Sequence, residues 1–190
     1  KKANQFGYYT ICLDNVEDNP GHKIANKSIN ISTTEKNFVL RAAEENNVDA
    51  VISYGTDVAI RTQAYVCNKL GLIGPSLESA NILTRKHKFR AFLQDHGIQK
   101  SFFLTLNNNK QNEIIDKIST ILGENNISFY VKPVDSSGGK GISCIHQVNE
   151  ILPALDYAFQ YSCEKTVIVE ETFDNSSKQL CGDGIILDSK

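Results

Sequence analysis

A lysine and a glycine-rich loop follow each other in the stretch FYVKPVDSSGGKGIS, residues 129–143. Lys132 lies near the end of an apolar run, and five of the seven residues 135–141 are Ser or Gly. Such a loop fits a surface hairpin that needs glycine for its backbone angles. It fits equally a phosphate-binding loop whose backbone N–H groups surround an anion. Loop composition alone favours neither.

The residues around the loop favour phosphate binding. The loop is not a Walker A motif, because Gly141 follows Lys140 where that motif has Ser or Thr. It also joins two expected strands, so no helix N-terminus is available to meet the phosphates. Lys132, on the strand that enters the loop, would instead bring a fixed positive charge to a phosphate. The alternative is a lone lysine that faces solvent.

A second candidate lies in VIVEE, residues 167–171, an apolar run that ends in two carboxylates. An extended backbone there could present one C=O and one N–H to the edge of an adenine, and a carboxylate could accept ribose hydroxyls. The alternative is an edge strand that ends in solvated acids.

The first half of the chain predicts parallel βα units, since short apolar runs alternate with amphipathic ones. Such sheets bind ligands beyond the carboxyl ends of their strands. The sequence SYGTD therefore gives Gly55, Thr56 and Asp57 as a candidate substrate site, and a simple strand-to-helix turn is the alternative. The expected strands cover residues 8–14, 28–32 and 48–55, and the expected helices cover 35–47 and 57–70.

The pattern changes after residue 84, which predicts a domain boundary there. The second half is expected to be α+β. Its expected helices cover residues 85–97, 107–126 and 148–161, and its strands cover 101–106, 127–133, 141–145, 165–173 and 180–188.

Composition limits the classes of function. The 190 residues are 41% hydrophobic and 22% charged with a net charge of −2, which is ordinary for a soluble globular protein and gives no basic field for nucleic acid. No run is long enough for a membrane span. The five scattered cysteines predict reduced thiols in a cytoplasmic protein. Because the chain has no Met, even at its start, we expect it to be incomplete at both ends.

Three segments in order, LTRKHKFRAFLQDHGI, YVKPVDSSGGKGI and VIVEETF, resemble the ATP-grasp superfamily of carboxylate–amine ligases. The pattern of strands and helices in the βα half resembles that of one group in the superfamily, which contains carbamoyl-phosphate synthase, biotin carboxylase and phosphoribosylglycinamide synthetase. The resemblance implies an α/β fold, with a Rossmann-like pre-ATP-grasp domain over residues 1–84 that lacks its first strand. The N-terminal part of an α+β ATP-grasp domain would follow over residues 85–190.

The resemblance also implies nucleotide-binding residues. Family members have a basic residue eleven positions before the glycine that ends the first helix of the ATP-grasp domain, and counting back from Gly97 gives Lys86. Lys132 would bridge adenine and the α-phosphate. The loop over the β- and γ-phosphates would consist of Ser136, Ser137, Gly138, Gly139, Lys140 and Gly141. The adenine-binding linker would consist of Val169, Glu170, Glu171, Thr172 and Phe173.

The sequence departs from the family pattern in two places. Gln179 stands near the position of a ribose-binding acid, and Arg85 precedes Lys86 where relatives often have an acid. The resemblance places the magnesium ligands and the catalytic residues downstream of Lys190, so no metal ligand is assigned here.

The implied activity uses ATP and Mg²⁺ to convert a substrate carboxylate into an acyl phosphate, which an amine-type acceptor attacks. The partners would be these small molecules, without nucleic acid or membrane, in a possible homodimer. Three alternatives stay open. One is a biotin-dependent or bicarbonate-activating carboxylase, and another is a non-catalytic nucleotide-binding module. The third is a plain α/β domain with a glycine hairpin that binds no nucleotide.

Overall fold

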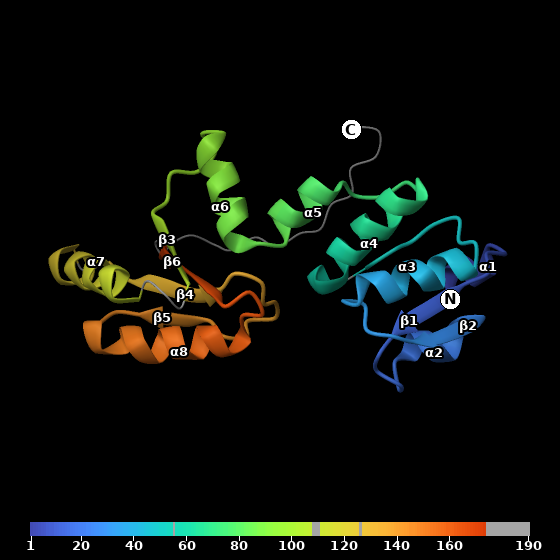
Figure 1. The fold of residues 1–190 in the computed structure, drawn as a ribbon. Helices are drawn as coiled ribbons and strands as arrows, with labels where there is room; N and C mark the ends of the chain where they lie inside the picture. The colour runs from blue at the N-terminus through green and yellow to red at the C-terminus, as the bar shows by residue number, and fades with distance from the viewer. Residues whose placement is uncertain (55, 108–110, 126, 174–190) are drawn as a thin grey trace. The chain divides into compact units, whose positions relative to one another are not determined.

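The computed structural model describes residues 1–54, 56–107, 111–125 and 127–173 (Figure 1). These residues form two compact units, both discontinuous in sequence. The first unit contains residues 1–100, 134–140 and 162–164. The second unit contains residues 101–133 and 141–161 and the residues from 165 on. The domain boundary expected near residue 84 stays a prediction.

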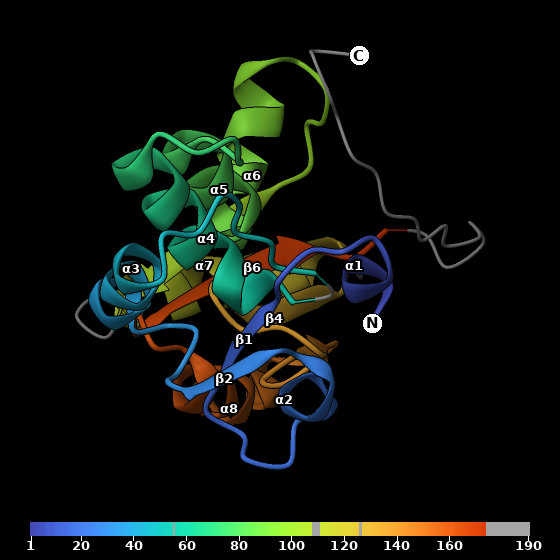
Figure 2. The same cartoon turned by 90° about the vertical axis from the view of Figure 1, so that its right-hand side faces the viewer.

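The first unit is built on two parallel strands, as the βα pattern predicts. Strand β1 (Ile11–Asp14) pairs with β2 (Lys27–Asn30), and Figure 2 shows them side by side. The connection between them contains the short helix α2 (Pro20–Ile24), whose first turn is capped by Asn19 through a bond from the Gly21 amide. Helix α1 (Lys2–Gln5) precedes β1.

Helices complete the first unit. Helix α3 (Lys36–Glu45) packs on α4 (Asp57–Leu70) through Val39, Ala43 and Val66. Gly71 ends α4 in the left-handed conformation with φ 66°, as its place after the apolar pattern predicts. Helices α5 (Leu77–Leu83) and α6 (Lys86–Asp95) follow, and each packs on the helix before it.

The strand expected over residues 48–55 is wrong, because its described residues, 48–54, pair with no other strand. The Gln63 side chain takes the place of a strand neighbour. Its Nε2 donates to the Val51 carbonyl oxygen at 2.8 Å, and its Oε1 accepts from the Ser53 amide at 3.1 Å. The backbone at Val51 and Ser53 is therefore held by a side chain of α4 and not by hydrogen bonds to a neighbouring strand.

The second unit is α+β, as expected, with a four-stranded sheet in the order β3-β6-β4-β5. All neighbouring strands are antiparallel. The strands are β3 (Phe103–Asn107), β4 (Phe129–Pro133), β5 (Ser143–Ile145) and β6 (Thr166–Glu171). The helices are α7 (Gln111–Asn125), the single turn η1 (Val148–Glu150) and α8 (Ile151–Tyr161).

One face of this sheet carries the main hydrophobic core. Phe129 and Val131 of β4 and Val169 of β6 pack there with residues of α7 and α8, such as Ile118 and Leu155. Successive side chains of a strand point to opposite faces. The residues between these core positions, among them Lys132 and Glu170, therefore lie on the face away from the helices.

The glycine-rich loop joins β4 to β5, as expected. Gly138, Gly139 and Gly141 have positive φ angles of 67°, 75° and 75°, which L side chains rarely adopt. Residues 137–140 are exposed, whereas Gly141 is buried. None of the helices in the described ranges is long and apolar enough to cross a membrane.

We predict that Gly141→Ala lowers the free energy of unfolding by more than Gly139→Ala does. Both glycines have φ 75°, so either alanine costs about 1–2 kcal/mol of backbone strain. The new Cβ at Gly141 would lie 2.7 Å from Pro133 Cγ and 3.0 Å from Tyr161 Cβ, while no heavy atom lies within 4 Å of it at Gly139. Urea unfolding of both variants measures the difference. Equal losses would show that packing around Gly141 does not matter.

Candidate functional site

Lys86 fixes the base of the glycine-rich loop within the first unit. It is the first residue of α6, and its amide donates to the Val134 carbonyl oxygen at 3.1 Å. Its Nζ donates to the Ser136 carbonyl oxygen at 2.6 Å. Both ends of one lysine therefore contact residues 134–136, which we call the loop base.

The loop beyond this base is open. Residues 137–140, which we call the loop tip, are exposed, and a Cβ built on Gly138 or Gly139 would meet no heavy atom within 4 Å. The Ser136 hydroxyl donates to the Lys140 carbonyl oxygen at 3.0 Å and so closes the loop across the tip. A short loop of small residues with exposed backbone is suited to bind an anion. The predicted loop residues thus lie together, next to Lys86.

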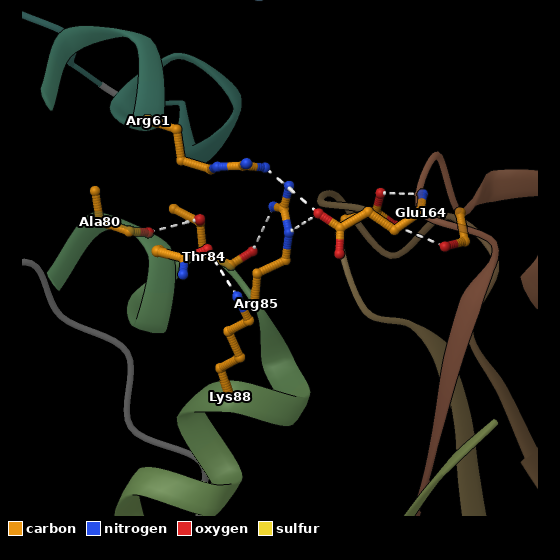
Figure 3. Close-up of polar contacts among 9 residues, drawn as sticks. Arg61, Ala80, Thr84, Arg85, Lys88 and Glu164 are labelled. Carbon is orange, nitrogen blue, oxygen red and sulfur yellow. Dashed lines mark hydrogen bonds and ion pairs between the residues drawn. The ribbon is translucent and has the colours of Figure 1, made fainter. Parts of the chain in front are cut away.

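An ion pair that the sequence does not indicate joins Arg85, the residue before Lys86, to Glu164 (Figure 3). Arg85 Nε donates to Glu164 Oε1 at 2.5 Å, and the Arg85 side chain is only 10% exposed. Arg61 Nη1 of α4 approaches the same oxygen at 3.5 Å. No local pattern could reveal the contact between Arg85 and Glu164, because 79 positions separate them.

Asp135 connects this ion pair to the loop base. Its Oδ2 accepts from the Glu164 amide at 2.9 Å, and its Oδ1 accepts from the Ser162 hydroxyl at 2.9 Å. Asp135 lies between the two loop residues that Lys86 contacts. The loop base is therefore held from α6 and from the segment 162–164 that follows α8.

His87 lies in the same part of α6. Burial lowers the pKa of His87, and the carboxylates of Glu164 and Asp135 only partly oppose this, with Lys88 and Arg85 acting in the same direction as burial. Its Nδ1 is buried, with no hydrogen-bond partner among the described residues. The imidazole therefore favours its neutral form.

In the second unit, Lys132 of β4 forms an ion pair with Glu170 of β6. The side chains are 18% and 7% exposed, so both charges are largely removed from water. Lys132 Nζ also lies 4.6 Å from the centre of the Tyr130 ring. Lys132 therefore does not face solvent, and its role in nucleotide binding stays a prediction.

The other predicted linker residues lie at the end of β6. This strand lies between β3 and β4, so the alternative of an edge strand that ends in solvated acids is wrong. Val169 is fully buried in the core, whereas Phe173 is 62% exposed. The Thr172 amide and hydroxyl donate to the Ser128 carbonyl oxygen at 3.0 and 3.2 Å, and the Glu171 amide donates to the Phe102 carbonyl oxygen at 3.2 Å.

Other predicted residues receive less support. Gly55 and Gln179 lie outside the described residues, as does the strand expected over 180–188. Thr56 and Asp57 lie at the start of α4, where Thr56 makes no side-chain capping bond. Among the residues that the structure describes, no three His, Cys, Asp or Glu side chains could together hold a metal ion. We therefore assign no step to a metal.

The chain is similar to curated and solved enzymes, although no family model matches it. It is 30% identical over 179 residues to a formate-dependent phosphoribosylglycinamide formyltransferase from Francisella tularensis, which covers 90% of this chain and 44% of the relative. The chain thus spans less than half the length of this relative.

Two solved structures extend the comparison. The D-alanine–D-alanine ligase from Helicobacter pylori has a TM-score of 0.52 and 26% identity, over 64% of this chain and 37% of the ligase. The biotin carboxylase domain of the Hydrogenobacter thermophilus 2-oxoglutarate carboxylase, solved with MgADP, ADP and bicarbonate, has a TM-score of 0.70. It is 18% identical, over 91% of this chain and 41% of that one, and shows the likeness of fold alone.

We predict that the pH dependence of stability includes a contribution from His87. Because the folded pKa is lowered, the unfolded chain binds more protons in the window below the ordinary histidine pKa of about 6.5. The contribution of neutral His87 to the free energy of unfolding is complete above the ordinary histidine pKa. It is lost as the pH falls through the lowered pKa of the folded protein. Urea unfolding between pH 5 and 8 should show a shallower acid loss for His87→Gln, with His96→Gln as the exposed control. Identical profiles for His87→Gln and the unmodified protein would contradict the assignment.

Proposed function

We infer that the chain belongs to the ATP-grasp superfamily of carboxylate–amine ligases, and from this premise we propose that the whole protein uses ATP to join a small carboxylic acid to an amine. The observation that carries the proposal is the glycine-rich loop, whose base is bound by both the amide and the Nζ of Lys86. An open loop tip beside a fixed cation suits the phosphates of a nucleotide.

The proposed reaction has two steps. A carboxylate oxygen attacks the γ-phosphorus of ATP, the bond to the bridging oxygen of ADP breaks, and an acyl phosphate and ADP result. The amine nitrogen then attacks the acyl carbon, phosphate leaves with the bonding electrons, and the nitrogen loses a proton. Acyl phosphates hydrolyse readily, so a loop that covers the phosphates would also exclude water.

Particular residues have proposed roles in this reaction. Lys86 and the loop residues Ser136, Ser137, Gly138, Gly139, Lys140 and Gly141 would bind phosphate. Lys132 would bind the nucleotide with a cation that is already desolvated and held by Glu170. The adenine and ribose would contact the residues at the end of β6, which are Val169, Glu170, Glu171, Thr172 and Phe173, with Gln179 further on. Gly55, Thr56 and Asp57 stay the proposed substrate site.

The relatives suggest the acid and the acceptor to test first. The formyltransferase from Francisella tularensis is named for its dependence on formate and its action on phosphoribosylglycinamide, and it covers 90% of this chain. We therefore propose formate as the acid and an amine of the glycinamide type as the acceptor. Mg²⁺ is proposed as the ion that accompanies ATP, with no ligand assigned to it among the described residues.

The assembly and location of the protein are also proposals. The homodimer that the family resemblance implies stays a proposal, and the solved carboxylase domain is itself described as a dimer. Four cysteines are free in the described part of the chain, which supports a reducing compartment such as the cytoplasm.

We predict that Lys132→Met weakens binding of ATP by more than tenfold. The nucleotide would lose a charge-assisted hydrogen bond worth about 1.5–3 kcal/mol. Titration calorimetry of the whole protein with ATP and Mg²⁺ measures this affinity. Lys117→Met is the matched control, because it removes an exposed lysine of α7, on the core face of the sheet. Far-UV circular dichroism establishes that both variants are folded, and equal affinity in the two would refute the role of Lys132.

We further predict that release of ADP depends on an added carboxylic acid. In a coupled ADP assay, formate should raise the rate at least tenfold over ATP alone when the glycinamide acceptor is present. Acetate and bicarbonate serve as comparisons of different size and charge distribution. A response to bicarbonate alone would favour the carboxylase alternative, and binding of ATP without release by any acid would favour a non-catalytic module.

A further inference from the structure

We propose that Arg85 and Glu164 are positioning residues that hold the base of the glycine-rich loop against Lys86. The inference rests on the proposed function, because it concerns how the loop is presented to the phosphates of ATP. Neither residue is proposed to contact the nucleotide. Their effect would pass through Asp135 and the neighbouring backbone of the loop base.

The first step of the argument is that Arg85 has little freedom. Its side chain is 10% exposed, and its Nε donates to Glu164 Oε1 at 2.5 Å. Its Nη1 donates to the Thr84 carbonyl oxygen at 3.1 Å, which ties the guanidinium to the residue before it (Figure 3). A buried arginine held at two nitrogens defines the position of the start of α6 closely.

The second step is that Glu164 transmits this position to the loop. Its side chain binds Arg85, while its amide donates to Asp135 Oδ2 at 2.9 Å. The other Asp135 oxygen accepts from the Ser162 hydroxyl at 2.9 Å. The carboxylate of Asp135 is therefore bound on both oxygens by the segment that the ion pair fixes.

The third step is that the contacts close into a ring. Arg85 reaches Asp135 through Glu164, and the next residue, Lys86, donates its amide to the Val134 carbonyl oxygen at 3.1 Å. Arg85, directly before α6, and Lys86, its first residue, thus hold two consecutive residues of the loop base. Breaking the ion pair would release the segment 162–164, which still binds Asp135, from Arg85. The loop base would then move relative to Lys86.

The position of Arg85 in the sequence adds to this interpretation. Arg85 directly precedes Lys86, so the ion pair acts on the residue next to the lysine that binds the loop base. The arginine meets a glutamate from a distant segment, so the charges form a pair whose members could be exchanged without changing the net charge. A positioning role predicts that the exchanged pair still works.

The experiment measures affinity for ATP and amide hydrogen exchange of the loop in the whole protein. We expect Glu164→Gln to weaken ATP binding at least fivefold by calorimetry, and to speed exchange in a peptide that covers residues 134–141. The double variant Arg85→Glu with Glu164→Arg should bind within about twofold of the unmodified protein. Arg61→Gln is the matched control, because Arg61 reaches the same Glu164 oxygen only at 3.5 Å and is 47% exposed.

The outcomes separate this inference from the proposed function. Failure of the unmodified protein to bind ATP overturns the proposed function, and the inference with it. Binding by the unmodified protein that Glu164→Gln leaves unchanged, with unchanged exchange over 134–141, overturns the inference alone. If the double variant does not fold, Glu164→Asp and Arg85→Lys replace it, because each keeps the charges of the ion pair. These two variants should bind ATP more tightly than Glu164→Gln does. Equal affinity and equal loop exchange in all three variants would also overturn the inference.

Discussion

Two hydrogen bonds from Lys86 to the loop base are the contacts on which the candidate site depends. They join the start of α6 to residues 134–136, which are nearly fifty positions further along the chain. A loop rich in glycine has high conformational entropy in the unfolded chain, so its native shape must be imposed from outside. Lys86 supplies part of that constraint, and Asp135 supplies the rest through Ser162 and Glu164. The tip stays open because none of these contacts involves Gly138 or Gly139.

Alternation along β4 and β6 imposes the second constraint. Val131 and Val169 must face α7 and α8 to complete the core, so Lys132 and Glu170 must face the other way. A buried ion pair is seldom a net gain in stability over apolar residues of similar volume, because both charges lose their hydration. A chain that keeps such a pair on the face away from its core has a cation that is already desolvated and oriented. This is what binding a phosphate or a nucleotide requires.

The sequence allowed the order of most elements to be predicted, since apolar periodicity identifies β1, β2, β4 and the helices. The helices so identified are α3, α4, α6, α7 and α8, whereas the short helices α1, α2 and α5 were not expected. The sequence also pointed to Lys132 and the loop, because their residue types suit an anion. The strand expected over 48–55 was wrong for a specific reason. Ile52 and Tyr54 are strand formers, yet they are 83% and 89% exposed, and Gln63 bonds the backbone beside them. Arg85 and Glu164 were missed because a contact between distant segments leaves no spacing to recognise.

The contacts of Lys86 and Asp135 order the loop base and leave the loop tip free. Val134 is buried and hydrogen-bonded, whereas residues 137–140 are exposed and include two glycines with positive φ. A loop that was free throughout would lose much entropy on closing over a ligand, and a loop that was fixed throughout would admit none. Fixing the base limits the part that must be ordered to the few residues of the tip. Closure over the phosphates of ATP would then cost little, because Lys86 and Asp135 have already set the direction in which the tip leaves the fold.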